Sequence, residues 1–320
     1  MSTQTGIDEH VERLNRISVK RLIDPERDVA GAVGDGQLLP DELLSIHGLG
    51  VSLTDEQRRT LGREEVASIL DNGIRFEAVL EAGFAFQVAL APNVMDPRIT
   101  YLLHEMGEET RHQRLFQRVI GQIDPTARNP LQGHWLLSRV DRRGQGWIIN
   151  HPALLYVMVL AGEEIPDLFQ KMASEHPDTD PFLAAVNRYH RQEEARHLSF
   201  ARAMLPEVWA EASRVDRFQV LHIAPTIVKQ MFAFLVQPGV YETIGLDGWA
   251  TWKAVNKLPE RLALLAEGTR PIVTALLDAG IIRSGHVPQP WQRLCQVDAK
   301  GRPLTPVSRS TPAIDAALAV

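Results

Sequence analysis

Cysteine is almost absent from this sequence. Among its 320 residues there is a single cysteine, Cys295, near the C-terminal end. One cysteine cannot form an internal disulfide or a thiolate cluster, so any bound metal must be held by histidine, aspartate or glutamate. Cys295 itself is expected to be a small, buried, apolar side chain.

Long apolar runs and an excess of positive charge are missing as well. The formal net charge is −6, and lysine and arginine form no basic stripe, which argues against a nucleic-acid partner. Residues 1–16 are polar and lack the apolar core of a signal peptide. The best apolar run, residues 154–162, ends at Glu163 and falls short of the roughly 18 residues of a membrane span. We therefore expect a soluble, cytoplasmic protein with no nucleic-acid or membrane partner.

Strand signals are scarce too, and helical patterns dominate after residue 51. Thr54 followed by Gln57 is typical of a capped helix start, and Asp96 followed by Pro97 marks another. Hydrophobic residues make up 44% of the chain, which is enough for one sizeable core. We predict an all-α protein, a four-helix bundle with additional flanking helices.

The chain divides into three parts by composition. Residues 1–50 are predicted to pack on the bundle as an N-terminal extension, and residues 51–296 to form the bundle domain. Residues 297–320 are polar, contain Pro and Ser, and are predicted to be a disordered tail. Helices are expected at residues 8–20, 63–90, 97–123, 152–174, 182–204, 214–236 and 257–280, with a loop at 124–146.

One pentapeptide pattern, E-E-x-R-H, occurs twice, at residues 108–112 and 193–197. Both copies fall inside expected long helices. Residues three apart share one face of a helix, so the second glutamate and the histidine of each copy can bind one metal ion. The four side chains concerned are Glu109, His112, Glu194 and His197.

A lone glutamate precedes each copy of the pattern at nearly the same distance. Glu77 lies 32 positions before Glu109, and Glu163 lies 31 positions before Glu194, each on the far side of a turn. Antiparallel neighbouring helices would therefore place each pair at one level. This is the signature of a dimetal carboxylate bundle. Two substitutes stay open, Glu81 for Glu77 on the same stripe and Glu164 for Glu163.

His190 adds a further nitrogen, because it lies one helical turn before Glu194 on the same face. Glu105 holds the corresponding position in the first copy, and its role stays open between a group that supports the site and a surface charge. Arg111 and Arg196 are expected to form salt bridges near the site rather than to touch substrate.

The ligand types favour iron or manganese over copper, which prefers more nitrogen or sulfur. Buried carboxylates without partners would be costly, and metal ions remove that cost. Two adjacent iron(II) ions can deliver two electrons to dioxygen. We therefore predict two iron ions and O2 as cofactors, with manganese possible in place of iron.

The ordered set of these residues resembles the p-aminobenzoate N-oxygenases, the AurF-like non-haem di-iron oxygenases of the ferritin-like superfamily. The H-x-x-x-E-x-x-H run is the most specific part, and residues 14–18 (L-N-R-I-S) and 24–25 (D-P) look similar as well. The resemblance covers about residues 10–290. The metal ligands that it implies are Glu77, Glu109, His112, Glu163, His190, Glu194 and His197.

The resemblance implies a homodimeric monooxygenase that oxidises an aromatic amine through hydroxylamine and nitroso stages to a nitro group. It also implies an external electron donor of the ferredoxin or flavin reductase type. No catalytic residue is expected apart from the ligands, and the residues that bind substrate stay unknown. Interior residues that could line a substrate pocket, or only the core, are Phe84, Val88, Leu160, Ile165 and Phe200.

Other functions remain compatible with the same ligands. They are a di-iron C–H hydroxylase or desaturase, a ferroxidase or iron-binding protein, a radical-generating subunit that uses Tyr101 or Tyr189, and a metal-free helical interaction protein. The long helical additions after Met204 argue against an iron-storage cage.

Overall fold

The computed structural model describes residues 2–132 and 135–304, and most of these residues are helical. Within these ranges the sole β feature is an isolated bridge between Val297 and Pro303. The prediction of an all-α fold is confirmed.

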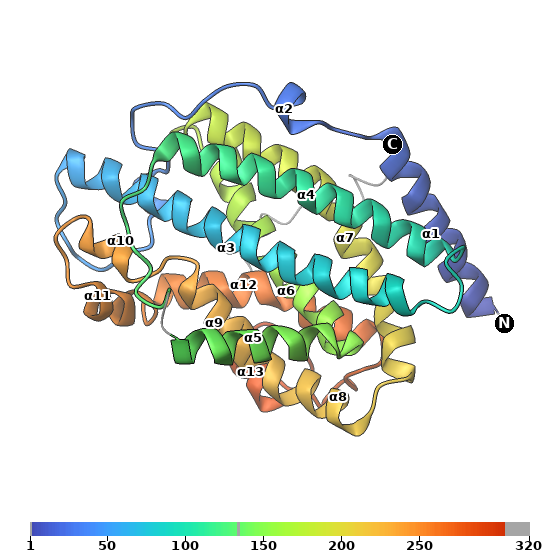
Figure 1. The fold of residues 1–320 in the computed structure, drawn as a ribbon. Helices are drawn as coiled ribbons and strands as arrows, with labels where there is room; N and C mark the ends of the chain where they lie inside the picture. Colours follow the sequence, from blue (N-terminus) through green and yellow to red (C-terminus); the bar gives the residue numbers. More distant parts are fainter. Residues whose placement is uncertain (1, 133–134, 305–320) are drawn as a thin grey trace.

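Four long helices form the central bundle (Figure 1). They are α3 (Asp55–Leu90), α4 (Pro97–Ile123), α6 (Pro152–Glu175) and α7 (Pro181–Ala210). Helix α3 packs along α4, and α6 packs along α7, so consecutive helices form two antiparallel pairs. This arrangement agrees with a ferritin-like bundle.

The starts of these helices are fixed by local sequence. The Thr54 hydroxyl accepts a hydrogen bond from the backbone N–H of Gln57, whose side chain in turn accepts one from the Thr54 N–H. Asp96 caps α4, and Asp180 caps α7 by accepting from the N–H of Leu183. Because both connecting turns are short and capped, residues at fixed distances from the turns come to the same level of the bundle.

Helix α1 (Ser2–Lys20) packs against α4 and α7 (Figure 1). The Asn15 side chain donates a hydrogen bond to the carbonyl of Pro97 at 2.9 Å, and the side chains of His10 and Ser199 lie 3.0 Å apart. The flanking elements are α2 (Pro25–Asp28), η1 (Asp41–Leu43), α5 (Trp135–Ile149), α8 (Arg214–Phe218), the π-helical η2 (Gln219–Ile223), α9 (Ala224–Phe234), α10 (Gly239–Glu242), α11 (Gly248–Val255), α12 (Pro259–Asp278) and α13 (Gln289–Cys295).

Helix α5 corrects one expectation, because residues 124–146 were predicted to be a loop. Gly144 and Gly146 lower the helical propensity of this segment, but α5 packs against α3 and α6, and such packing overrides propensity. Helix α7 also runs past Pro206 to Ala210, although the sequence suggested an end near residue 204. An interior proline removes one backbone hydrogen bond without ending this helix.

The buried apolar residues form two clusters, one on either side of the level that carries the repeated glutamates and histidines. On α3, for example, Leu70 belongs to one cluster and Leu80 to the other. The level between them is polar and equally buried. Cys295 is fully buried, as predicted, and its thiol lies 3.5 Å from the carbonyl oxygen of Thr269.

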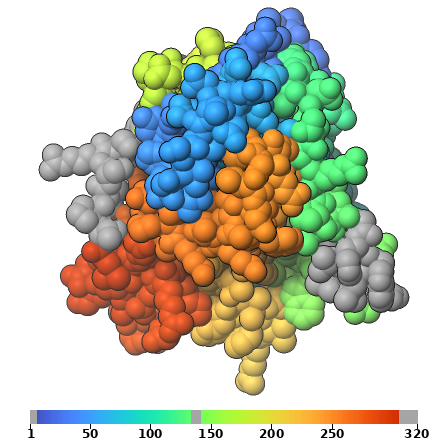
Figure 2. Space-filling model, turned by 90° about the vertical axis from the view of Figure 1, so that its left-hand side faces the viewer, coloured from blue at the N-terminus to red at the C-terminus, as the bar shows by residue number. Residues whose placement is uncertain are grey.

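Figure 2 looks at one end of the bundle, where the first turns of α3 border the segment that contains α10 and α11. Here Glu65 is buried and accepts hydrogen bonds from the Ser45 backbone N–H, at 2.9 and 3.1 Å, and from the Ser45 hydroxyl, at 2.5 Å. The Tyr241 hydroxyl lies 3.0 Å from the same Ser45 oxygen. This end is thus held by a closed polar network.

The expected tail, residues 297–320, is described only in its first part. Residues 297–304 turn back on themselves, and Val297 is buried. The rest of the expected tail, 305–320, lies outside the described residues. By length and composition, the helical stretch at residues 214–242 is apolar enough to cross a membrane, a property that buried core helices share. In this structure 44% of its most apolar part is buried.

Candidate metal centre

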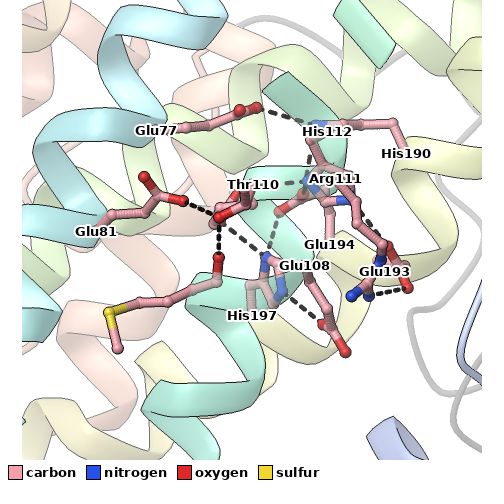
Figure 3. A network of polar contacts seen from close by, with 12 residues as sticks. Glu77, Glu81, Glu108, Thr110, Arg111, His112, His190, Glu193, Glu194 and His197 are labelled. Carbon is pink, nitrogen blue, oxygen red and sulfur yellow. Dashed lines mark hydrogen bonds and ion pairs between the residues drawn. The ribbon is translucent and has the colours of Figure 1, made fainter. Parts of the chain in front are cut away.

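The structure brings all seven sequence-predicted ligands into one buried cluster in the middle of the bundle. Figure 3 shows five of them, Glu77, His112, His190, Glu194 and His197. Each of the seven is between 0% and 4% exposed. Helix α3 supplies one glutamate, α4 a glutamate and a histidine, α6 one glutamate, and α7 two histidines and a glutamate. They are Glu77, Glu109, His112, Glu163, His190, Glu194 and His197.

The two substitutes left open by the sequence point elsewhere. Glu81 accepts a hydrogen bond from the Thr110 hydroxyl at 2.9 Å, away from the cluster (Figure 3). Glu164 pairs with Arg202. Neither belongs to a group of closely spaced ligand atoms among the described residues. The geometry therefore favours Glu77 and Glu163.

One half of the centre surrounds the imidazole of His112. Its Nδ1 atom lies 3.2 Å from Glu109 Oε2 and 3.2 Å from Glu194 Oε1. His190 turns its Nε2 atom toward the same place, 3.3 Å from Glu194 Oε1 and 3.4 Å from Glu77 Oε1. Two nitrogens and three carboxylates thus converge on one point.

The other half surrounds His197. Its Nδ1 atom lies 2.9 Å from Glu194 Oε2 and 3.2 Å from Glu109 Oε1. Glu163 lies near His190 instead, with a carboxylate oxygen within 4.8 Å of the ligand atoms of Glu194 and His190. Glu109 and Glu194 therefore present one oxygen to each half. A carboxylate placed in this way can bridge two metal ions.

The second nitrogen of each imidazole is held by a residue that sequence reasoning did not select. His112 Nε2 lies 3.1 Å from Glu193, and His197 Nε2 lies 2.9 Å from Glu108. These are the first glutamates of the two E-E-x-R-H copies, and each serves the histidine of the other copy. A hydrogen bond at Nε2 leaves Nδ1 free of its proton and turned toward a metal. The second, adjacent glutamate in each copy of the motif was the sequence feature that could have indicated these hydrogen bonds.

The arginines of the motif complete this support. Arg111 donates to Glu193 at 3.2 Å, and Arg196 donates to Glu108 at 2.9 Å. Both salt bridges were predicted. His190 is held differently, since its Nδ1 atom lies 3.0 Å from the Gln170 side-chain oxygen, and no sequence pattern indicated Gln170.

Without metal, the electrostatics of the cluster are unfavourable to bare carboxylates. Burial and the charges of the two central carboxylates raise the pKa of Glu77 and Glu163 well above its usual value. Burial alone would lower the pKa of His112 and His197, but the surrounding carboxylates raise it well above normal. Burial lowers the pKa of His190 to about 4. Metal ions would displace the protons held here, so metal binding should weaken as the pH falls.

The donor set fits a pair of cations. The Glu77 Oε2 atom is buried and has no hydrogen-bond donor in the described parts of the chain. His112 Nδ1 faces two carboxylates, although one nitrogen can donate only one proton. Carboxylates with imidazoles suit iron or manganese. Two such ions would satisfy the open oxygens and cancel the crowded negative charge.

The spacing between α3 and α6 depends on Gly162, the residue before Glu163. A Cβ atom at this position would overlap the ring of Phe76, the residue before Glu77. Because Gly162 has no side chain, this ring lies directly on the backbone of α6. Two ligands on different helices are thereby kept close together.

The interior residues named as possible pocket lining belong to an apolar core cluster beside the ligands. Phe84, Leu160, Ile165 and Phe200 are buried there, and Val88 packs against them. This placement favours a packing role.

The similarity to known proteins extends over both copies of the E-E-x-R-H motif. A family model described as P-aminobenzoate N-oxygenase AurF matches residues 4–280. An uncharacterized protein of Mycobacterium tuberculosis is 28% identical over 244 residues, which cover 72% of this chain and 70% of the relative. An uncharacterized protein of Mycobacterium bovis is similar to the same extent.

Proposed function

Because the chain belongs to the AurF family of p-aminobenzoate N-oxygenases, we propose that it is a di-iron monooxygenase that oxidises the nitrogen of an aromatic amine. One observation carries the proposal beyond family membership. Glu109 and Glu194 each direct one oxygen to the His112 half and the other to the His197 half. Such a pair of carboxylates is suited to joining two ions.

The ligands divide between the two ions. His112, His190 and Glu77 would hold one ion and His197 would hold the other, while the two central glutamates face both. Glu163 would add a carboxylate beside His190 and Glu194. When bound, two iron(II) ions supply two electrons to dioxygen. In a first N-oxygenation one oxygen atom enters the N–H bond and the other leaves as water, so two electrons and two protons are consumed. An external ferredoxin or flavin reductase would restore the electrons.

Side chains of the bundle exclude water on one side of the ligands. Phe84, Tyr101, Tyr156 and Phe200 come from α3, α4, α6 and α7 in turn, and each is at most 1% exposed. The ring centroids of Tyr101 and Phe200 lie 4.2 Å apart, and those of Tyr156 and Phe200 lie 6.1 Å apart. A dry, aromatic boundary suits chemistry in which solvent must not intercept reactive oxygen.

The remaining features of the proposal concern partners and place. We propose a homodimer that acts in the cytoplasm without a membrane or nucleic-acid partner. The family supports an aromatic amine as substrate, whereas the final oxidation stage, hydroxylamine, nitroso or nitro, belongs to the proposal. Manganese could replace iron, since both suit these ligands.

Turnover of amines tests the proposal directly. The protein is loaded with iron(II), supplied with a reductant and 18O2, and mixed with p-aminobenzoate or aniline. The expected product carries 18O on nitrogen, as measured by mass spectrometry, and Glu109→Ala serves as the inactive control. Oxygen on carbon would favour a C–H hydroxylase instead. Iron oxidation with the amine untouched would favour a ferroxidase.

A further inference from the structure

Glu105 is a buried carboxylate that the ligand set described above does not use. It lies on α4 one turn before Glu109 and is 1% exposed. One of its oxygens lies within 4.8 Å of ligand atoms of Glu109 and His197. Its Oε2 atom is buried and has no hydrogen-bond donor in residues 2–132 and 135–304. A buried carboxylate oxygen in this condition is costly unless a cation completes it.

The internal repeat gives Glu105 a counterpart. Glu105 precedes Glu109 by four residues, as His190 precedes Glu194. His190 turns its Nε2 toward the His112 half of the centre. Glu105 is grouped with His197, in the other half. The two positions are thus equivalent in the repeat and serve opposite halves, one with nitrogen and one with oxygen.

Neighbouring Glu108 shows what a supporting carboxylate looks like here. Glu108 pairs with the Arg196 guanidinium at 2.9 Å and with His197 Nε2 at 2.9 Å, so the chain itself supplies its partners. Glu105 instead has an oxygen close to ligand atoms of both Glu109 and His197, and its Oε2 atom has no donor among the described residues. The different surroundings separate the supporting role of Glu108 from a metal-binding role of Glu105.

We propose that Glu105 is a fifth carboxylate ligand, bound to the ion on the His197 half. One ion then has two imidazoles, and the other has one imidazole and an additional carboxylate. The inference rests on the proposed function only in assuming two bound ions. It predicts that the two ions bind with different affinities and that the His197 half depends on Glu105.

Metal titration tests this assignment without any turnover. Wild-type protein and Glu105→Gln are titrated with Co²⁺ under anaerobic conditions, and binding is followed by calorimetry and by visible absorption. The wild type should bind two ions. Glu105→Gln should bind one ion with unchanged affinity and the second at least tenfold more weakly, with altered absorption. Glu65→Gln, an equally buried change outside the centre, should match the wild type.

A swap variant keeps the test independent of folding. Glu105→His makes the two halves of the repeat alike and restores a ligand, so it should bind two ions again with a changed spectrum. The unfolding temperature adds a further readout, because bound ions stabilise the folded state. Glu105→Gln should reduce the increase in unfolding temperature on adding Co²⁺. A merely structural role would lower the metal-free unfolding temperature and leave that increase unchanged.

The outcomes separate the two proposals. Two ions in Glu105→Gln with unchanged affinity and spectrum would overturn the role of Glu105 and leave the proposed function standing. Equal weakening of both ions would also overturn it, because Glu105 is assigned to one half. A wild type that binds no pair of ions would refute the proposed function itself.

Discussion

Two buried polar clusters on helix α3 differ in how their carboxylates are completed. At the end of the bundle, both oxygens of Glu65 accept hydrogen bonds from Ser45, and neighbouring Glu64 accepts from the backbone N–H groups of Thr126 and Ala127. In the middle of the bundle, Glu77 has a buried oxygen with no donor in the described chain. The chain closes the first cluster by itself and leaves the second open to cations.

This contrast teaches how to separate a structural acid from a ligand. Burial alone does not distinguish the two, since Glu65 is 1% exposed and Glu77 is 4% exposed. The completeness of the hydrogen bonds does distinguish them, because a buried oxygen without a donor is unfavourable unless another group compensates. Substitutions in the two clusters should therefore have different consequences, one for metal content and one for stability.

The largest effect is expected from the central carboxylates. Glu109→Ala or Glu194→Ala removes a group that faces both halves, so both ions should be lost. Elemental analysis of protein grown with iron measures this, and circular dichroism checks the helices. Two irons per chain in either variant would contradict the ligand assignment. The central cluster would then not differ from the Glu65 cluster in binding metal.

A smaller effect is expected at one half only. His190→Ala removes a nitrogen from the His112 half, so one ion should bind about a hundredfold more weakly, with the helical fold intact. Iron(II) titration under anaerobic conditions measures both affinities. Full iron content together with full activity would show that His190 is not a ligand.

The supporting glutamates should have weaker effects again. Glu193→Gln removes the carboxylate that fixes the His112 imidazole, and loss of such outer contacts typically lowers metal affinity about 10–100-fold. Glu164→Gln is the matched control, because its carboxylate pairs with Arg202 outside the cluster. Equal affinities in these two variants would mean that the hydrogen bond at His112 Nε2 does not orient the ring.

The closed cluster should respond to pH rather than to metal. Burial raises the pKa of Glu65 from 4.5 to about 7, so the folded protein keeps a proton that the unfolded chain releases. Its stability should therefore fall as the pH rises from about 4.5 to about 7. At ~1.4 kcal/mol per pKa unit, the decrease is at most about 3.5 kcal/mol.

Glu65→Gln isolates this contribution. In metal-free protein, urea unfolding at a series of pH values should show a flatter stability curve for the variant than for the wild type. Parallel curves would mean that Glu65 ionises equally easily in the folded and unfolded states, and that its network is not the cause.

The sequence predicted which side chains come together in the candidate centre, because they follow simple helical spacing. Glu109 with His112, and Glu194 with His197, were found from positions three apart, and the lone glutamates from their equal distance across a turn. The choice between Glu77 and Glu81 needed the structure, because both lie on one stripe a turn apart. Only the Thr110 hydroxyl on the facing helix shows where Glu81 points.

Contacts between helices were beyond prediction from spacing. The pairing of Glu108 with His197 depends on how α4 and α7 lie against each other, and Gln170 reaches His190 from α6. Helix α5 was missed for the same reason, since packing against α3 and α6 supports it despite weak propensity. Such features arise from the assembled bundle.

Gly162 would have a consequence for the magnetism of two ions bound in the proposed centre. The residues beside Phe76 and Gly162 are ligands on opposite helices, and a side chain at Gly162 would require the ring or a helix to move. Exchange coupling between two ferric ions depends steeply on the bridges that join them. One absent methyl group would therefore help to set how closely the ligands of two such ions approach, and with that the strength of the coupling between their spins.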